Sequence, residues 1–240
     1  AVRLLMGAAA QHPFTSFFSG DESLNARPMG RVAEPLTKMG ARITARSDCR
    51  LPLALTGSSA LLPISYRLPV ASAQVKSAIL LAGLAAPGDT SIVEPAPSRD
   101  HSERMLRHFG AELRVEDVAS GGRKITVSGQ PELSAQTLSV PADFSSAAFP
   151  LAAALIVPGS DVLLRNVGIN PLRGGLLECV REMGGAVELR NMKEISGEPV
   201  ADIVVRGAKL HGIEVAAARA PSMIDEYPVL AVLAACAEGP

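Results

Sequence analysis

The stretch SAQVKSAILLAGLAAPG, residues 72–88, decides the fold of this chain. It is apolar on all sides, has few β-branched residues and ends at Pro87-Gly88, a pattern that predicts a buried helix followed by a turn. Similar apolar runs end 71 residues later at Gly159 and a further 80 residues later at Gly239. A charged helical pattern that ends in glycine recurs in the same way, at Gly40, Gly110 and Gly184. Two interleaved periods indicate an internal structural repeat.

Within one repeat, the periodicity changes along the chain. Residues 91–93 predict a short strand, and residues 101–108 predict a surface helix closed by Gly110. Residues 113–115 and 124–127 alternate as half-buried strands around a glycine turn at residues 120–122. We therefore predict an α/β fold of repeated βαβαββ units around buried helices. In the surface-helix pattern of residues 28–39, the interior Pro35 predicts a break.

Composition excludes several classes of protein. The 240 residues include 23 basic and 24 acidic side chains and only 3% aromatics, which excludes a typical nucleic-acid-binding surface. The longest apolar run, residues 147–157, contains Pro150 and is shorter than the roughly 20 residues of a membrane span. Three widely spaced cysteines and the lack of a leader pattern favour reduced thiols in the cytoplasm. His101-x-Glu103 has no Pro-Cys-x-x-Cys partner, so no metal site is predicted.

Polar residues that differ between the repeats lie where the buried helices begin. Sixteen positions before each closing glycine are Ser72, Asp143 and Met223, and fourteen positions before it are Gln74, Ser145 and Asp225. A helix start favours an anion by about 0.3 to 2 kcal/mol, too little to define a ligand. Ser72 and Asp143 are also ordinary N-cap residues.

Arginines supply the charge that helix starts lack. Arg3, Arg27, Arg99 and Arg173 each lie near an end of a predicted helix. A charge-assisted arginine contact contributes about 1.5 to 3 kcal/mol, so two or three together can select a phosphate or carboxylate. Taken singly, each is equally typical of a solvated surface arginine.

Four segments, in their order and spacing, resemble the family of 5-enolpyruvylshikimate-3-phosphate synthase. They are Arg27-Pro28-Met29-Gly30-Arg31, Ser72-Ala73-Gln74-Val75-Lys76, Arg99-Asp100-His101-Ser102-Glu103 and Pro221-Ser222-Met223-Ile224-Asp225-Glu226-Tyr227-Pro228. The second and third resemble the class II, glyphosate-tolerant branch, whereas Asn170-Pro171-Leu172-Arg173 departs from that branch's Asn-x-Thr-Arg.

This resemblance implies the enolpyruvyl transferase fold, an inside-out α/β barrel of two globules with three βαβαββ units each. The crossover between globules would fall near residues 140–143. Residues 1–141 would then be a first globule that lacks its opening unit, the shikimate-phosphate side, and residues 142–240 the opening part of the second. We expect both globules to be incomplete, and the uncovered faces to favour self-association.

The reaction implied is transfer of the enolpyruvyl group of phosphoenolpyruvate to the 5-hydroxyl of shikimate 3-phosphate, with release of phosphate and without metal or organic cofactor. By the resemblance, Ser72, the Ala73 backbone and Arg99 would hold the shikimate phosphate, and Gln74 would pack on the ring. Arg27 would hold phosphoenolpyruvate, and Arg3 would act more indirectly.

The catalytic residue implied by the resemblance is Asp225, which would take the 5-hydroxyl proton. The family's early Lys-Ser segment and its later Lys-Glu and Arg residues lie outside the chain, so we do not expect catalysis by this chain alone. Two other functions stay open. One is UDP-N-acetylglucosamine enolpyruvyl transfer, which the Ser-Ala-Gln and Arg-Pro-Met-Gly motifs disfavour, and the other is a non-catalytic anion-binding module.

Overall fold

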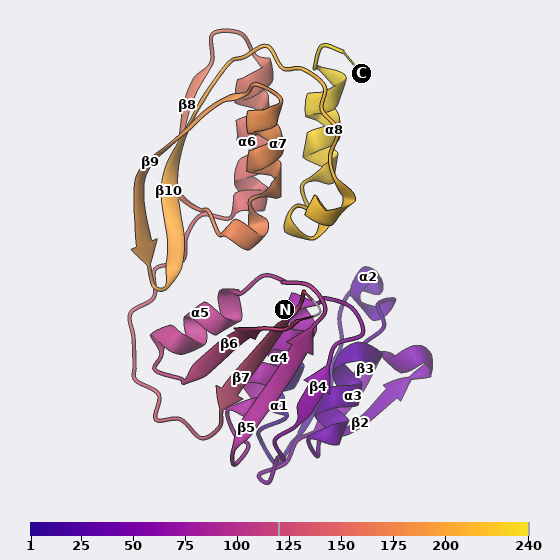
Figure 1. Cartoon of the computed structure of the whole chain (residues 1–240). Helices are drawn as coiled ribbons and strands as arrows, with labels where there is room; N and C mark the ends of the chain where they lie inside the picture. Colours follow the sequence, from indigo (N-terminus) through magenta and orange to yellow (C-terminus); the bar gives the residue numbers. More distant parts are fainter. Residues whose placement is uncertain (120, 240) are drawn as a thin grey trace. The chain divides into compact units, whose positions relative to one another are not determined.

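The computed structural model describes residues 1–119 and 121–239. The chain divides into two compact units, Ala1–Ala135 (unit 1) and Gln136–Pro240 (unit 2), and each has its own hydrophobic core. Both units combine helices with antiparallel strands (Figure 1). No helix in the described ranges is both long and apolar enough to span a bilayer.

Unit 1 contains two successive runs of elements. The first run is α1 (Val2–Ala9), β1 (Thr15–Phe18), α2 (Glu22–Asn25), α3 (Gly30–Lys38), β2 (Arg42–Arg46), the 3-10 turn η1 (Ser47–Cys49) and β3 (Arg50–Thr56). The second is β4 (Ser65–Arg67), α4 (Ala73–Gly83), β5 (Asp89–Glu94), α5 (His101–His108), β6 (Leu113–Asp117) and β7 (Arg123–Ser128). The second run therefore has the predicted βαβαββ order. The predicted turn at residues 120–122 includes residue 120, which lies outside the described part of the chain.

Unit 2 repeats the same order of helices and strands. Its elements are α6 (Phe144–Ile156), β8 (Asp161–Gly168), η2 (Pro171–Arg173), α7 (Gly175–Glu182), β9 (Ala186–Ile195), β10 (Glu198–Arg206), η3 (Ala217–Ser222) and α8 (Tyr227–Ala235). Instead of an opening strand, Ala142 forms an isolated parallel bridge with Val167 of β8.

The three sheets share one topology. Their orders are β1-β3-β2, β4-β5-β7-β6 and β8-β10-β9, so the last strand of each repeat always lies between the two that precede it. Among the strands that the structure describes, all pairings are antiparallel except that of β4 with β5. This shared topology is what the sequence period of 70 to 80 residues reflects.

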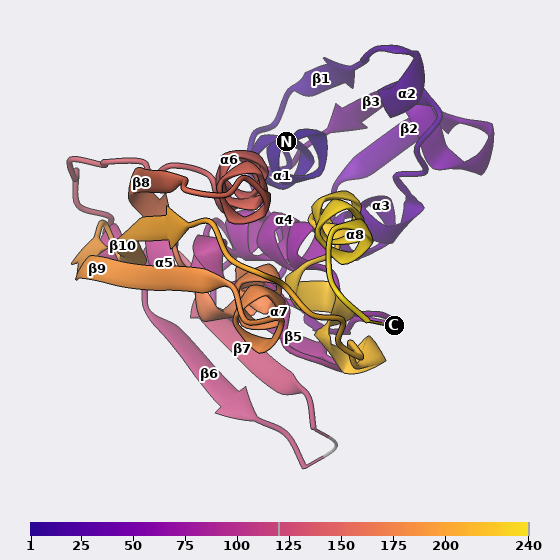
Figure 2. The ribbon, with the colours of Figure 1, turned by 90° about the horizontal axis from the view of Figure 1, so that it is seen from above.

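Helix α4 is the buried helix of unit 1, as its all-round apolar sequence predicts. Its residues from Val75 to Leu80 are buried, and it lies beside α1 and α3 (Figure 2). The contact with α1 is very close, since a Cβ on Gly7 would lie 2.2 Å from the carbonyl oxygen of Ala78. This packing places the first turns of α1 and α4 together.

The break predicted at Pro35 is wrong, because α3 continues from Gly30 to Lys38. Proline removes one N–H, whose partner would have been the carbonyl of residue 31 in the first turn. Pro35 is itself buried beside Leu36 in the core, and its carbonyl accepts from Met39 N at 3.0 Å. Burial of this apolar face offsets the loss of a single hydrogen bond.

Candidate active site

The start of α4 joins two of the segments singled out in the sequence. Ser72 is the N-cap, and its Oγ accepts from Val75 N at 3.4 Å, so its capping role is real. Gln74, two residues on, is exposed, and its Oε1 accepts from Arg3 Nη1 at 2.5 Å. Arg3 Nη2 also donates to the carbonyl oxygen of Pro28 at 3.2 Å. Arg3 therefore ties the first turn of α4 to the segment at residues 27–31.

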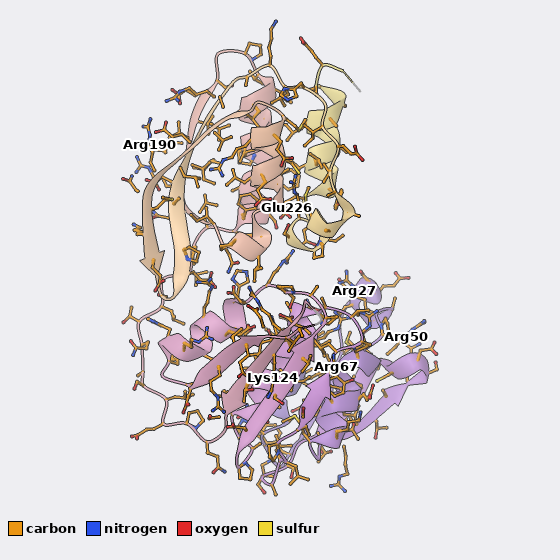
Figure 3. All side chains as sticks on the ribbon, viewed as in Figure 1. Arg27, Arg50, Arg67, Lys124, Arg190 and Glu226 are labelled. Atoms are coloured by element: carbon orange, nitrogen blue, oxygen red, sulfur yellow. The ribbon has the colours of Figure 1, made fainter. Side chains whose placement is uncertain are left out.

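Two other arginines lie close enough to Arg3 to affect its charge. The pKa of Arg3 is lowered, first by burial and then by the positive charges of Arg27 and Arg31. Arg27 and Arg31 are exposed, and Figure 3 labels Arg27 on the segment that follows α2. An anion would relieve this repulsion and gain charge-assisted hydrogen bonds. Sequence reasoning gave Arg31 no role, although its place in the same segment was visible.

The third segment reaches α4 through its neighbour Ser98. Lys76 Nζ, in the early part of α4, donates to the carbonyl oxygen of Ser98 at 3.2 Å. Arg99 follows directly and is half-buried. Lys76 also forms buried ion pairs with Glu94 at 3.3 Å and with Glu103 at 2.8 Å. The six candidate residues of unit 1 thus lie on segments that meet at the start of α4.

The buried carboxylates were not predicted. Burial raises the pKa of Glu103, against the opposing effect of Lys76. One signal could have found this cluster, because Lys76 is the only charged residue in residues 72–88. A lysine in a buried helix needs a partner of opposite charge.

Asp225 lies in unit 2, exposed, between η3 and α8. Its neighbour Glu226, labelled in Figure 3, lies just before α8. Glu226 is 1% exposed and accepts from Ser145 Oγ at 2.5 Å. Ser145 Oγ in turn accepts from Arg173 Nη2 at 2.7 Å. The start of α8 is therefore anchored to α6 and η2 through the residue next to Asp225. Sequence reasoning missed Glu226 as an anchor.

Arg173 completes this network at the N-cap of α6. Its Nη1 pairs with Asp143 Oδ1 at 3.2 Å, and Asp143 Oδ2 accepts from Ser146 N at 2.8 Å. Burial raises the pKa of Asp143, but the hydrogen bonds from Ser146 and the charge of Arg173 outweigh it, and the net pKa is lowered. Asp143 is therefore a helix cap, and Arg173 pairs within unit 2.

The segment before Asp225 is held to α7. Arg219 of η3 donates to both carboxylate oxygens of Glu182 at 2.7 Å and lies 3.5 Å from Glu178. These contacts fix η3, from which the chain continues to Asp225. Within the described residues, no group of three or more His, Cys, Asp or Glu side chains could hold a metal ion.

Fold comparison places this chain among proteins with the mixed α/β enolpyruvyl transferase fold. It superposes over 98% of its length on the enolpyruvyl transferase NikO from Streptomyces tendae, with a TM-score of 0.71 at 19% identity and 54% of that chain covered. The sequence model of the EPSP synthase (3-phosphoshikimate 1-carboxyvinyltransferase) family matches residues 1–240. The chain belongs to the EPSP synthase family.

Its relatives agree with this assignment. A 3-phosphoshikimate 1-carboxyvinyltransferase from Paramagnetospirillum magneticum is 60% identical over 237 residues, which are 99% of this chain and 53% of the relative. The EPSP synthase structure from Acinetobacter baumannii is 46% identical with a TM-score of 0.86, over 99% of this chain and 53% of that one. The chain spans about half the length of the relatives it matches.

Proposed function

We propose that this chain is part of an enzyme that transfers the enolpyruvyl group of phosphoenolpyruvate to the 5-hydroxyl of shikimate 3-phosphate and releases phosphate. The observation that carries the proposal is the meeting of three motif segments at one helix start. Arg3 bonds to Gln74 and Pro28, and Lys76 bonds to Ser98, beside Arg99. Guanidinium groups and backbone N–H groups suit two anionic substrates.

Unit 1 would recognise the phosphate of the acceptor. The Ser72 hydroxyl, the Ala73 backbone N–H and the Arg99 guanidinium would contact the phosphate, and Gln74 would pack on the ring. The bond from Arg3 supports this arrangement, because it orients the Gln74 side chain from a second helix. Arg3 is in this proposal a positioning residue.

Phosphoenolpyruvate would bind at Arg27. The repulsion of Arg3 by Arg27 and Arg31 supports an anion at this place, since a carboxylate or phosphate would neutralise part of the positive charge.

Asp225 would accept the proton of the 5-hydroxyl as its oxygen bonds to C2 of phosphoenolpyruvate, while the C2–C3 double bond opens and C3 takes up a proton from a donor outside this chain. The resulting tetrahedral adduct then loses phosphate from C2 and a proton from C3, which restores the double bond. A general base must be held within hydrogen-bond reach of the proton it removes. The anchoring of Glu226, the next residue, to Ser145 supports such a fixed position.

We further propose that residues 1–141 correspond to the shikimate-phosphate globule and residues 142–240 to the opening part of the second. The class II assignment is also a proposal. It is supported by the ion pair between Lys76 and Glu103, one from each class II motif. In a protein extended to the length of the relatives, class II predicts turnover at glyphosate concentrations that stop a sensitive enzyme, and inhibition at low glyphosate would contradict it.

Calorimetric titration of this chain with shikimate 3-phosphate tests the phosphate site. We expect saturable binding that is absent for unphosphorylated shikimate and lost in Arg99→Ala. The matched control is Arg114→Ala, because Arg114 pairs with Asp89 at the start of β5, whereas the loop that carries Arg99 follows the end of this strand. Equal binding of both ligands, or binding that survives Arg99→Ala, would refute this role of unit 1.

We expect turnover in a protein extended to the length of the relatives. We expect phosphate release from phosphoenolpyruvate with shikimate 3-phosphate as acceptor and none with UDP-N-acetylglucosamine, which separates the two transferase functions. Asp225→Asn should abolish turnover and preserve substrate binding. Retained turnover in this variant would remove Asp225 from the mechanism.

A further inference from the structure

Three charged side chains are buried together in unit 1. They are Lys76 on α4, Glu94 at the end of β5 and Glu103 on α5, and each side chain is 3% exposed or less. Removal of charges from water is expensive, and apolar residues of similar volume often stabilise a core equally well. The two carboxylates also outnumber the one ammonium group. Stability alone therefore does not explain this cluster.

The contacts of the cluster converge on Ser98. Glu94 Oε1 accepts from Ser98 N at 3.2 Å, and Glu94 Oε2 accepts from Ser98 Oγ at 2.5 Å. Lys76 Nζ donates to the Ser98 carbonyl oxygen at 3.2 Å. The backbone N–H, the backbone carbonyl and the hydroxyl of one loop residue are thus all bound by two buried side chains.

The rest of the loop has little freedom. Between Glu94 and Ser98 the sequence is Pro95-Ala96-Pro97, and each proline fixes its own φ. A short, proline-stiffened loop with its last residue anchored on three sides determines where the next residue emerges. That residue is Arg99, and α5 begins directly afterwards at His101.

One helix links this loop to the other half of the phosphate site. The backbone N of Lys76 donates to the Ser72 carbonyl oxygen at 3.0 Å, within the first turn of α4. The same turn carries Ser72 and Ala73, so the Lys76 side chain connects their helix to the Arg99 loop.

We propose that Lys76 and Glu94 are positioning residues that hold Ser98, and through it Arg99, against the start of α4 for recognition of the acceptor's phosphate. This role rests on the proposed function of Arg99. Lys76 is the central member, because it bonds to both carboxylates and to Ser98. Glu103 contributes one oxygen to Lys76, and its Oε2 has no hydrogen-bond partner among the described residues.

The chain offers a variant and a matched control. Lys76→Met keeps an unbranched side chain that is one atom shorter, and it removes the three contacts of Nζ. Glu103→Gln keeps an oxygen that can accept from Lys76, and it replaces an oxygen that has no partner. If Lys76→Met does not unfold cooperatively, the isosteric Glu94→Gln is measured instead. Its affinity for shikimate 3-phosphate and its Ser98 amide exchange are then judged by the outcomes given below for Lys76→Met.

Calorimetry measures the effect on ligand recognition. We expect Lys76→Met to bind shikimate 3-phosphate about tenfold more weakly and Glu103→Gln to stay within about threefold of the parent. Parent-like affinity in Lys76→Met, or equal weakening in both variants, would overturn the positioning role.

A measurement without ligand separates this proposal from the proposed function. The amide proton of Ser98, bonded to Glu94, should exchange with solvent at least about tenfold faster in Lys76→Met than in Glu103→Gln. Unchanged exchange would overturn the positioning role even if shikimate 3-phosphate binds. Faster exchange in a chain that does not bind shikimate 3-phosphate would support the anchoring of the loop and refute only the assigned ligand.

Discussion

Replacement of Gly7 by alanine tests whether α1 and α4 must touch through their backbones. A Cβ at this position would lie 2.2 Å from the carbonyl oxygen of Ala78 and 2.7 Å from its Cα. The atoms it meets belong to the backbone of a buried helix, so no side chain can rotate away. One helix has to shift by about 1 Å to restore ordinary van der Waals contact.

The expected loss of stability follows from two opposing effects. Overpacking of a close-packed core costs about 1 to 3 kcal/mol, and the upper end applies where backbone must move. Alanine is a better helix former than glycine by about 1 kcal/mol. We therefore expect Gly7→Ala to lower the free energy of unfolding by about 2 kcal/mol, or the melting temperature of the chain by about 4 to 8 °C.

The same shift should reach the candidate site. Arg3 lies one turn before Gly7 on α1, and Gln74 lies one turn before Ala78 on α4. Their 2.5 Å hydrogen bond spans the two helices, and separation by about 1 Å would break it. Affinity for shikimate 3-phosphate should therefore fall together with stability.

Urea denaturation followed by circular dichroism measures the first effect, and calorimetric titration measures the second. The matched control is Gly30→Ala at the start of α3, where a Cβ would meet only Cys49 Cβ at 3.8 Å. This control should be as stable as the parent. If Gly7→Ala unfolds within about 0.5 kcal/mol of the parent, backbone contact does not set the spacing of α1 and α4.

Three further predictions concern unit 2. Because the pKa of Asp143 is lowered, its stabilisation is present above the carboxyl's unfolded pKa and is lost as the pH falls through its folded pKa. Asp143→Asn, which still caps α6, should therefore lose less stability in acid than the parent. An unchanged pH profile in urea melts would contradict this. Ser145→Ala leaves the buried Glu226 without its donor and should cost about 1 to 3 kcal/mol in the same melts, whereas a neutral result would mean that water replaces the hydroxyl. Arg219→Ala should accelerate hydrogen exchange across η3, and equal exchange would show that its bonds to Glu182 do not hold this segment.

Much of the fold could be predicted from the sequence, because apolar periodicity reports burial directly. The all-round apolar pattern of residues 72–88 predicted a buried helix, and α4 is one. The alternating residues 113–115 and 124–127 predicted two strands, and β6 and β7 pair there. The error at Pro35 has a physical origin, since the sequence shows the lost N–H but not the core that surrounds the proline.

The candidate site was less accessible to this reasoning, because polar residues acquire roles from partners that are distant in sequence. Gln74, Ser145 and Asp225 hold equivalent positions in three repeats. They lie two residues after Ser72, Asp143 and Met223, respectively. The structure gives them different environments. Gln74 bonds to Arg3 on another helix, Ser145 lies between Arg173 and the buried Glu226, and Asp225 is exposed.

Each of these environments depends on which neighbouring element packs against the start of the helix. Gln74 meets α1 because Gly7 allows the two helices to touch, and Ser145 meets α8 because a carboxylate at position 226 is turned inward. That inward carboxylate leaves the adjacent Asp225 on the outer side of the same turn. A repeat period can therefore locate such positions, but only the contacts between repeats decide which one ties helices together and which one stays exposed.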